Sequence, residues 1–151
     1  MGTLLEEEWG GTAFETLDDD ECVDLMRDRT IGRVAVTIGA IPAVFPVSFT
    51  FLDGAIYFRT GEGTQLARAV CRSVVAFEVD DFDPVQHRGW SVLAVGVARP
   101  VEPDASVAAL ASRLPLRALG SGEKEQWMRI WPEFLSGRRI TESGPGPTSW
   151  P

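Results

Sequence analysis

A chain of 151 residues with 44% hydrophobic content is long enough for one domain with a sizeable core and too short for two. Its formal net charge of -8 argues against a general affinity for nucleic acid or anionic lipid, so anionic ligands must be met by local arginines. No apolar run approaches a membrane span and the N-terminal residues lack the pattern of a signal peptide, so we expect a cytoplasmic protein that does not insert into a membrane.

The N-terminal region predicts an arm followed by a helix. Residues 1–15 are acidic and aperiodic, which is typical of a flexible arm. Thr16 opens a predicted helix whose first turn holds the acidic residues 18–21, where the helix dipole favours negative charge. The acidic run is therefore explained by capping rather than by a metal site. The apolar stripe of this helix is Leu17, Val23, Leu25 and Met26.

Alternation of residue types predicts two strands, over residues 31–38 and 41–52, joined by a turn at residues 39–40. An Asp-Gly pair at residues 53–54 is a strong hairpin signal and predicts a third strand over residues 55–59. The second strand has a core face and a face that is partly polar. The core face is Phe45, Val47, Phe49 and Phe51, and the other face carries Ser48 and Thr50.

Residues 56–72 predict a strand, a glycine turn and a helix capped by Thr64. The first turn of a helix has backbone N–H groups without intrahelical partners, and Gly61 and Gly63 let a ligand approach the backbone. With positive charge nearby, the stretch is a candidate phosphate site, although the same pattern also makes an ordinary connection. The charges are Arg59, Arg68 and Arg72.

Two further strands are predicted over residues 73–79 and 89–101, with a break at residues 80–84. The single histidine, His87, falls in the loop that follows this break, where an exposed histidine without function is favoured over a haem ligand or proton donor.

The C-terminal third predicts a helix over residues 105–114, a second helix over residues 122–131 and a short strand at residues 138–141. Trp127, Ile130 and Trp131 would share one side of the second helix. Residues 142–151 are rich in Gly and Pro and predict a disordered tail.

Hairpin connections, with one helix between the third and fourth strands, predict a mainly β fold: an antiparallel barrel with peripheral helices over residues 16–141. A parallel dinucleotide-binding sheet is disfavoured. Cys22 and Cys71 are far apart and have no partner at metal-ligand spacing, so we expect reduced, partly buried cysteines and neither a disulfide nor a metal site.

Six segments, in order, resemble the FMN-binding split-barrel family that includes the pyridoxamine 5'-phosphate oxidases, and especially its short oxidase-like branch. The resemblance covers roughly residues 17–141. The segments are Ile-Gly-Arg-Val-Ala at 31–35, Pro-Val-Ser-Phe at 46–49, the strand and Thr-Gly-Glu-Gly-Thr turn at 56–64, Ser-Val-Val-Ala-Phe-Glu-Val-Asp at 73–80, Gly-Trp-Ser-Val at 89–92 and Gly-Arg-Arg-Ile at 137–140.

The resemblance implies a homodimer with FMN on the barrel between two subunits. The isoalloxazine ring would lie along the second strand, largely on backbone groups, and the phosphate would lie at the end of the third strand. The implied contacts are Pro46, Val47, Ser48 and Phe49 for the ring, Arg59, Thr60, Thr64 and Gln65 for the phosphate, and Trp90 and Ser91 from the partner chain.

Two departures from the family pattern stand out. Gln65 replaces a common Lys or Arg, so it can hydrogen-bond a phosphate but adds no charge, and neighbouring arginines must compensate. The basic C-terminal motif that binds substrate in the true oxidases differs here in spacing and length, so pyridoxamine phosphate is not the expected substrate.

Three functions remain open. The first is an FMN-dependent oxidoreductase acting on an unknown small molecule, in which no side chain need be the acid or base. The second is a deazaflavin-dependent reductase on the same fold. The third is a module that binds a flavin or haem without turnover.

Overall fold

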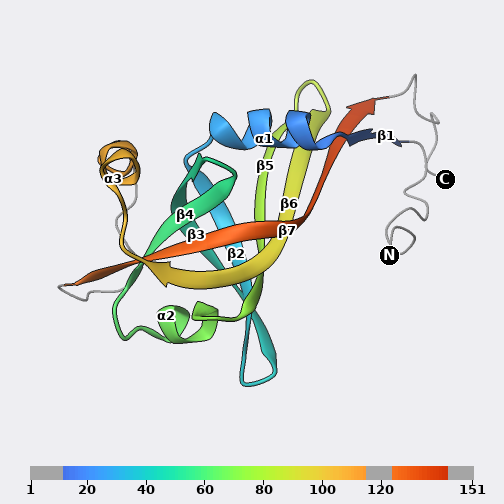
Figure 1. The fold of residues 1–151 in the computed structure, drawn as a ribbon. Helices are drawn as coiled ribbons and strands as arrows, with labels where there is room; N and C mark the ends of the chain where they lie inside the picture. Colours follow the sequence, from blue (N-terminus) through green and yellow to red (C-terminus); the bar gives the residue numbers. More distant parts are fainter. Residues whose placement is uncertain (1–11, 115–123, 143–151) are drawn as a thin grey trace.

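In the part of the chain that the structure describes, seven strands form one antiparallel sheet in the order β1-β7-β4-β3-β2-β5-β6, and pairing of β6 with β7 closes it into a barrel (Figure 1). The computed structural model describes residues 12–114 and 124–142. The predicted fold class, a split β-barrel with peripheral helices, is confirmed. The strands are β1 (Thr12–Leu17), β2 (Ile31–Ile38), β3 (Ile41–Leu52), β4 (Ala55–Gly61), β5 (Val74–Asp83), β6 (Arg88–Val101) and β7 (Glu125–Glu142), and the helices are α1 (Asp19–Arg27), α2 (Gln65–Val70) and α3 (Ala105–Ala111).

The core fills the barrel and extends under two helices. Phe49, Phe58 and Phe77 are fully buried inside the barrel, where the rings of Phe49 and Phe77 meet edge to face with centroids 4.7 Å apart. Helices α1 and α2 lie at opposite ends of the barrel (Figure 1). Their apolar stripes add Met26 and Leu66, among others, to the same core cluster. The helices therefore close the barrel rather than form a separate layer.

The predicted turns and caps are largely confirmed. Both residues of the β2–β3 turn and both residues of the β3–β4 turn have positive φ angles, which is the backbone that two-residue hairpins need. Thr64 caps α2 by accepting a hydrogen bond from the Ala67 N–H at 3.1 Å, and Asp104 caps α3. Cys22 is buried, whereas Cys71 is exposed rather than partly buried, and both are free thiols.

The N-terminal prediction was wrong in part. Residues 12–17 form β1, which pairs with the end of β7, so residues 12–15 are not a loose arm and Thr16 does not open the helix. The helix begins two residues later behind Asp18. The Asp18 carboxylate accepts from the Glu21 N–H at 2.9 Å, and the Glu21 carboxylate accepts from the Asp18 N–H at 3.1 Å. Capping thus explains the acidic run, as expected.

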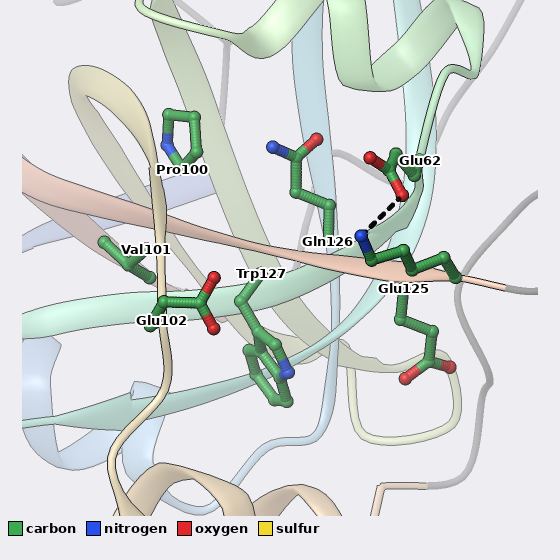
Figure 2. Close-up of a pocket in the computed structure, with 8 residues that line it drawn as sticks. Glu62, Pro100, Val101, Glu102, Glu125, Gln126 and Trp127 are labelled. Atoms are coloured by element: carbon green, nitrogen blue, oxygen red, sulfur yellow. Dashed lines mark ion pairs between the residues drawn. The ribbon is translucent and has the colours of Figure 1, made fainter.

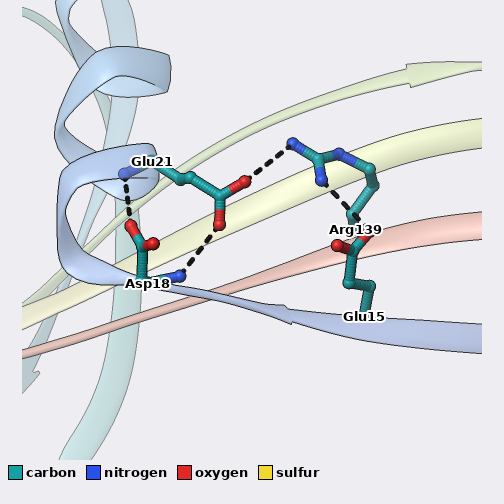
Figure 3. A network of polar contacts seen from close by, with 4 residues as sticks. All are labelled: Glu15, Asp18, Glu21 and Arg139. Carbon is teal, nitrogen blue, oxygen red and sulfur yellow. Dashed lines mark hydrogen bonds and ion pairs between the residues drawn. The ribbon is translucent and has the colours of Figure 1, made fainter.

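Arg139 of β7 joins β1 and α1 (Figure 3). Its guanidinium lies 3.1 Å from the Glu15 carboxylate and 3.6 Å from the Glu21 carboxylate. Because Glu21 also completes the helix cap, this network fixes the start of α1 against the end of the sheet.

The predicted helix over residues 122–131 is wrong, because β7 begins at Glu125 and runs through the predicted short strand to Glu142. Met128 and Ile130 are fully buried at alternate positions, which is the period of a strand. Pairing with β4 on one edge and with β6 on the other satisfies the backbone of this segment and overrides its helical spacing. A register shift at Val95 and Gly96 accommodates Pro132.

The predicted break at residues 80–84 is also wrong in part, since β5 continues to Asp83 and pairs with the start of β6. The acidic side chains of this extension are balanced by arginines. Arg29 lies 2.6 Å from the Asp81 carboxylate, and Arg33 lies 3.1 Å from the Asp80 carboxylate.

The described residues contain no helix long and apolar enough to cross a membrane. The C-terminal tail was predicted over residues 142–151. Residue 142 is the last residue of β7, and residues 143–151 lie outside the described residues.

Candidate functional site

The sheet opens into a fork between β3 and β4. Pairing of these strands ends at Phe49 and Phe58, whereas β3 from Ile41 to Ser48 pairs with β2, and β4 continues along β7. In the described part of the chain, no ladder joins β3 and β4 beyond that pair. If the register continued, Ser48 would lie opposite Arg59 and Val47 opposite Thr60. The fork therefore separates residues predicted for the ring from residues predicted for the phosphate.

The backbone of β3 presents polar groups to this fork. The Phe49 N–H donates to the Thr30 carbonyl at 2.9 Å, on the side of β2. Because backbone groups alternate between the two edges of a strand, the N–H and C=O of Ser48 and the C=O of Pro46 point the other way, toward β4. These are groups that can hydrogen-bond the edge of a planar heterocycle.

Both hydroxyl residues of the fork, Ser48 of β3 and Thr60 of β4, are buried. Ser48 is 6% exposed. Thr60 is fully buried on the inner face, and its hydroxyl donates to the Gln126 carbonyl at 3.4 Å. Val47 and Phe49 are buried in the core, as predicted, and Pro46 is exposed.

Arg59 is the principal cation of the fork. Its guanidinium Nη1 lies 3.1 Å from the Glu125 carboxylate, and its Cζ lies 5.5 Å from the centre of the Trp127 ring. The side chain of Arg59 is 15% exposed and that of Glu125 is 39% exposed. Arg59 and Trp127 are cross-strand partners on the outer face of β4 and β7, so the sheet itself fixes the guanidinium in place.

The start of α2 brings the other predicted phosphate residues near the end of β4. The Thr64 hydroxyl both caps the helix and donates to the Gly61 carbonyl at 2.8 Å, while Gln65 is exposed. Arg68 donates to the Gly63 carbonyl at 2.6 Å. Gly63 has a φ of +74°, and a Cβ there would meet no atom within 4 Å, so the turn is accessible to a ligand.

Trp90 and Ser91 lie away from the fork, at the start of β6, and on opposite faces of the sheet. The inner-face Trp90 packs against the core, and the Arg29 guanidinium Cζ lies 5.2 Å from its ring centre. Ser91 is half-buried on the outer face, paired with Asp80 of β5 and Arg138 of β7. The described chain thus does not bring these two residues together with the fork.

A pocket of about 250 Å³ was not predicted from the sequence (Figure 2), and two of the residues that line it, Glu125 and Trp127, contact Arg59. Its walls come from Glu62, from residues 100–102 at the end of β6 and from residues 124–127 at the start of β7. Trp127 and Gln126 point to opposite sides of β7. The Lys124 ammonium lies 3.6 Å from the Glu62 carboxylate.

The outer face of the sheet is largely apolar across β3, β2, β5, β6 and β7, which the sequence reasoning also missed. The signal was present in β6, where the residues of both alternating faces are mostly apolar. This pattern is typical of strands covered on both faces. The exposed fractions of Val44, Val74 and Phe134 are 61%, 69% and 51%. Between them lie the half-buried Ala35, Ala76, Leu93, Val95 and Val97.

One polar cluster interrupts this apolar face. Arg33 of β2 lies 2.9 Å from Glu78 and 3.1 Å from Asp80, both on β5. Burial and the nearby Asp80 charge raise the pKa of Glu78, although Arg33 opposes the rise. Hydrogen bonds to Asp80 and then Glu78 raise the pKa of Arg33. Two carboxylates thus share one guanidinium on a partly desolvated surface.

The described side chains show no cluster of three or more His, Cys, Asp or Glu that could hold a metal ion. The fork instead combines backbone hydrogen-bonding groups, buried hydroxyls and a guanidinium, which is the chemistry of binding a planar, phosphorylated ligand.

Comparison with known proteins identifies relatives over most of the chain. A family model described as pyridoxamine 5'-phosphate oxidase matches residues 18–139. The uncharacterized protein Rv0080 of Mycobacterium tuberculosis is 36% identical over 129 residues, covering 82% of this chain and 84% of that protein.

Solved structures share the fold. The FAD binding protein from Mycobacterium smegmatis is 33% identical with a TM-score of 0.66, over 84% of this chain and 98% of that chain. A FAD-binding protein from Mesorhizobium loti gives a TM-score of 0.71 at 21% identity, over 87% of this chain and 100% of that chain, which is a likeness of fold alone.

Proposed function

The chain belongs to the pyridoxamine 5'-phosphate oxidase family, and on that premise we propose that it is a flavin-dependent oxidoreductase that acts on a small molecule. The cofactor is bound through its FMN moiety at the fork between β3 and β4. The finding that the relative from Mycobacterium smegmatis is described as a FAD binding protein supports a flavin as the cofactor.

The observation that carries the proposal is the fork itself. Ladder pairing between β3 and β4 ends at Phe49 and Phe58, and the backbone of Pro46 and Ser48 points into the gap. A flavin ring carries donors and acceptors along its pyrimidine edge, so these backbone groups can fix its orientation without any charged side chain. Val47 and Phe49 hold this segment rigidly in the core.

The phosphate end of the cofactor would lie at the end of β4 and the start of α2. Arg59 supplies the main charge, because its planar guanidinium can contact Glu125 and a phosphate at the same time. Thr64 and Gln65 add polar groups at the accessible turn around Gly63. The Thr60 hydroxyl bonds the Gln126 carbonyl, so Thr60 contributes mainly by shaping the end of β4.

A bound flavin supplies the acceptance and return of a hydride. The protein binds and orients it, and the core beneath the fork keeps water from the side of the ring that faces the barrel. The proposal assigns no side chain as the catalytic acid or base, and the substrate and electron donor stay open.

The site is completed by a second copy of the chain in a two-fold dimer. The apolar outer face is the surface that a second copy would cover, because Val44, Val74 and Phe134 are more than half exposed on it. Ser91 lies on this face and would contact the partner's flavin through its side chain, whereas Trp90 would act through its backbone or by supporting the strand.

The test is titration of purified protein with FMN, FAD and a deazaflavin cofactor, followed by mixing with nicotinamide donors under air. Tight flavin binding with reduction and reoxidation is expected. Preference for the deazaflavin would replace the cofactor assignment, and flavin binding without any redox turnover would leave a binding module.

Light scattering tests the dimer independently. Leu93→Asp, which places a charge at the centre of the apolar face, should give monomers with weakened flavin binding. A wild-type monomer with full flavin occupancy would overturn the shared site.

A further inference from the structure

Two arginines, Arg99 of β6 and Arg129 of β7, lie directly opposite each other in the ladder between these strands and are called the arginine pair below. Their neighbours Ala98, Met128 and Ile130 are fully buried on the inner face, so both arginines lie on the outer face of the sheet. Like charges directly opposite each other in an antiparallel ladder are destabilising. The arginine pair therefore calls for a compensating negative charge.

The described part of the chain does not supply that charge. Within it, neither guanidinium of the arginine pair has a hydrogen bond or an ion pair. By contrast, Arg29, Arg33 and Arg59 each pair with a carboxylate at 2.6–3.1 Å. Arg129 is half-buried and Arg99 is exposed, so an anion can reach both of them from solvent.

Aromatic side chains surround the arginine pair on the same face. Tyr57 of β4 lies opposite Arg129, and Trp127 and Trp131 lie two positions before and after Arg129 along β7. The ring edge of Trp131 lies 3.8 Å from where a Cβ on Gly54 would be, so the β3–β4 turn supports the ring. Trp131 is nevertheless 56% exposed, which leaves the ring accessible to a planar ligand.

The arginine pair can offer a ligand its side chains but not its backbone. At Arg129 the strand pairs with β4 on one edge and with β6 on the other, so the ladders use the backbone groups. Phosphate sites commonly add free backbone N–H groups from a helix start or a glycine turn. A planar carboxylate needs only the guanidinium forks, which match it with two parallel hydrogen bonds. The surface thus favours a carboxylate over a phosphate.

The arginine pair adjoins the proposed flavin site on the side away from the phosphate end. Tyr57 precedes Arg59 by two positions on β4. Arg129 follows Trp127, the cross-strand partner of Arg59, by two positions on β7. Helix α2 lies on the other side of Arg59, beyond the end of β4. Because the core covers the side of the fork that faces the barrel, a reactant must approach a bound flavin from the outer face.

We propose that Arg99 and Arg129 bind the carboxylate of a planar organic acid whose ring lies against Trp131, and that this acid is the small molecule on which the flavin acts. The inference rests on the proposed function and extends it by naming the substrate class. A second copy of the chain is a poor occupant of this surface, because two uncompensated guanidiniums are costly to bury.

The experiment measures the dissociation constant of benzoate by equilibrium dialysis, for the protein with and without FMN. Arg99→Gln and Arg129→Gln should each weaken benzoate binding about tenfold, because each removes charge-assisted hydrogen bonds to the carboxylate. Arg129→Lys keeps the charge but loses the planar fork, so its affinity should fall between those of the wild type and Arg129→Gln. Arg27→Gln is the matched control and should change nothing, because it removes an exposed charge that pairs with Asp24 on α1.

Two further probes test the ligand class. Cyclohexanecarboxylate has no flat ring and should bind more weakly than benzoate, and Trp131→Ala should abolish that difference. Phenyl phosphate should bind no more tightly than benzoate. Tighter binding of phenyl phosphate through the arginine pair would overturn the carboxylate assignment. Equal binding of benzoate by the wild type and by both glutamine variants would overturn the whole inference while leaving the proposed function intact.

Spectra and light scattering separate a substrate site from a structural role. Benzoate should shift the flavin absorption band of the wild type and not that of Arg129→Gln, as expected for an acid beside the ring. FMN affinity and oligomeric state should be unchanged in Arg99→Gln and Arg129→Gln, and loss of either would mean that the arginine pair serves the cofactor or a second copy, which would overturn the inference. A protein that binds benzoate through the arginine pair but binds no flavin would overturn the proposed function, and the substrate role with it.

Discussion

Two regions of the molecule each combine an arginine, a carboxylate and a tryptophan, and they differ in what surrounds this trio. Arg59 pairs with Glu125 at 3.1 Å and lies over the Trp127 ring at 5.5 Å. At the start of β6, Arg29 pairs with Asp81 at 2.6 Å and lies over the Trp90 ring at 5.2 Å. The local chemistry of the two trios is nearly the same.

The surroundings of the two trios separate their roles. The Arg59 side chain is 15% exposed and contacts Glu125 and Trp127, which line a pocket, whereas the Arg29 side chain is 40% exposed and lies over a tryptophan that packs on the core. A trio beside a cavity can exchange or share its partners with a ligand. A trio over the core can only hold the barrel together. Location, rather than residue type, is thus the reason to propose Arg59, and not Arg29, as a ligand-binding arginine.

The comparison is broken most directly by removing each arginine. Arg59→Ala should weaken binding of FMN by about 1.5–3 kcal/mol, because a charge-assisted contact to phosphate is lost. Arg29→Ala, the matched control, should leave affinity within about twofold, because it loses a half-exposed pair with Asp81 and not a phosphate contact. Flavin fluorescence titration gives both values. Equal losses for the two variants would remove Arg59 from the phosphate site.

Arg33→Ala is a second control, and its effect on FMN affinity should be as small as that of Arg29→Ala. The Arg33 side chain is half exposed on the outer face.

For stability the order of the two trios should reverse: loss of Trp90, in the Arg29 trio, should lower the unfolding free energy more than loss of Trp127, in the Arg59 trio. Trp90→Ala should lower the unfolding free energy by about 2 kcal/mol, because this ring packs on the core but is only partly buried. Removal of a fully buried tryptophan ring costs about 3–5 kcal/mol. Trp127→Ala should cost about 1 kcal/mol or less, because its ring lies beside an existing pocket. Urea unfolding of the flavin-free proteins measures both. A larger loss at Trp127 would mean that this trio, too, is mainly structural.

Local chemistry made much of the fold predictable. The turns at Gly39 and at Asp53–Gly54, and the caps at Thr64 and Asp104, depend on residues within a few positions of each other, and each forms as predicted. The strands between these turns follow from simple alternation.

The errors occur where a distant partner decides the conformation. Trp127, Ile130 and Trp131 have helical spacing, but the segment pairs with β4 and β6, whose sequences lie far earlier in the chain. Residues 12–17 form a strand only because the last part of β7 offers an edge, and a sequence window around them cannot show that edge.

The candidate site also has a part that could be predicted from local sequence and a part that could not. The segment from Pro46 to Phe49 and the cation Arg59 could be selected because their motifs are continuous in sequence. The pocket could not, because Glu62, Glu102 and Trp127 come from three separate segments that only the closed barrel brings together. The predicted partner contacts at Trp90 and Ser91 stay predictions, since they concern a second copy.

The departure at Gln65 offers a finer test of the Arg59 region. If Gln65 replaces a lost cation beside the phosphate, Gln65→Lys should tighten FMN binding by about 1 kcal/mol at low salt. The gain should shrink as salt rises, because Gln65 is exposed and such charges are screened over roughly 8–10 Å. Arg68→Gln, one helical turn on, should weaken binding less than Arg59→Ala, because Arg68 bonds the Gly63 carbonyl. Titration at two salt concentrations decides the point, and no gain at low salt would place the phosphate elsewhere.

The smallest expected effect is on the pH dependence of stability. It concerns Glu78, which shares a third arginine, Arg33, with Asp80. Burial and the Asp80 charge hold the pKa of Glu78 above its ordinary value in the folded protein. The folded state therefore binds this proton more tightly than the unfolded chain does. The resulting stabilisation is present at pH values below the unfolded-state pKa, and it is lost as the pH rises through the folded-state pKa.

Glu78→Gln cannot ionise, so the variant should lack this part of the pH dependence. The unfolding free energy of the wild type should fall relative to that of Glu78→Gln as the pH rises from below the ordinary glutamate pKa of about 4.3 toward neutrality. Urea unfolding of both proteins across that range measures the difference, and the Arg33 contact, which favours ionised Glu78, opposes the fall. A difference that is constant with pH, or that runs the other way, would mean that Arg33 outweighs burial and Asp80, and that this shared arginine behaves like the simple pairs at Arg29 and Arg59.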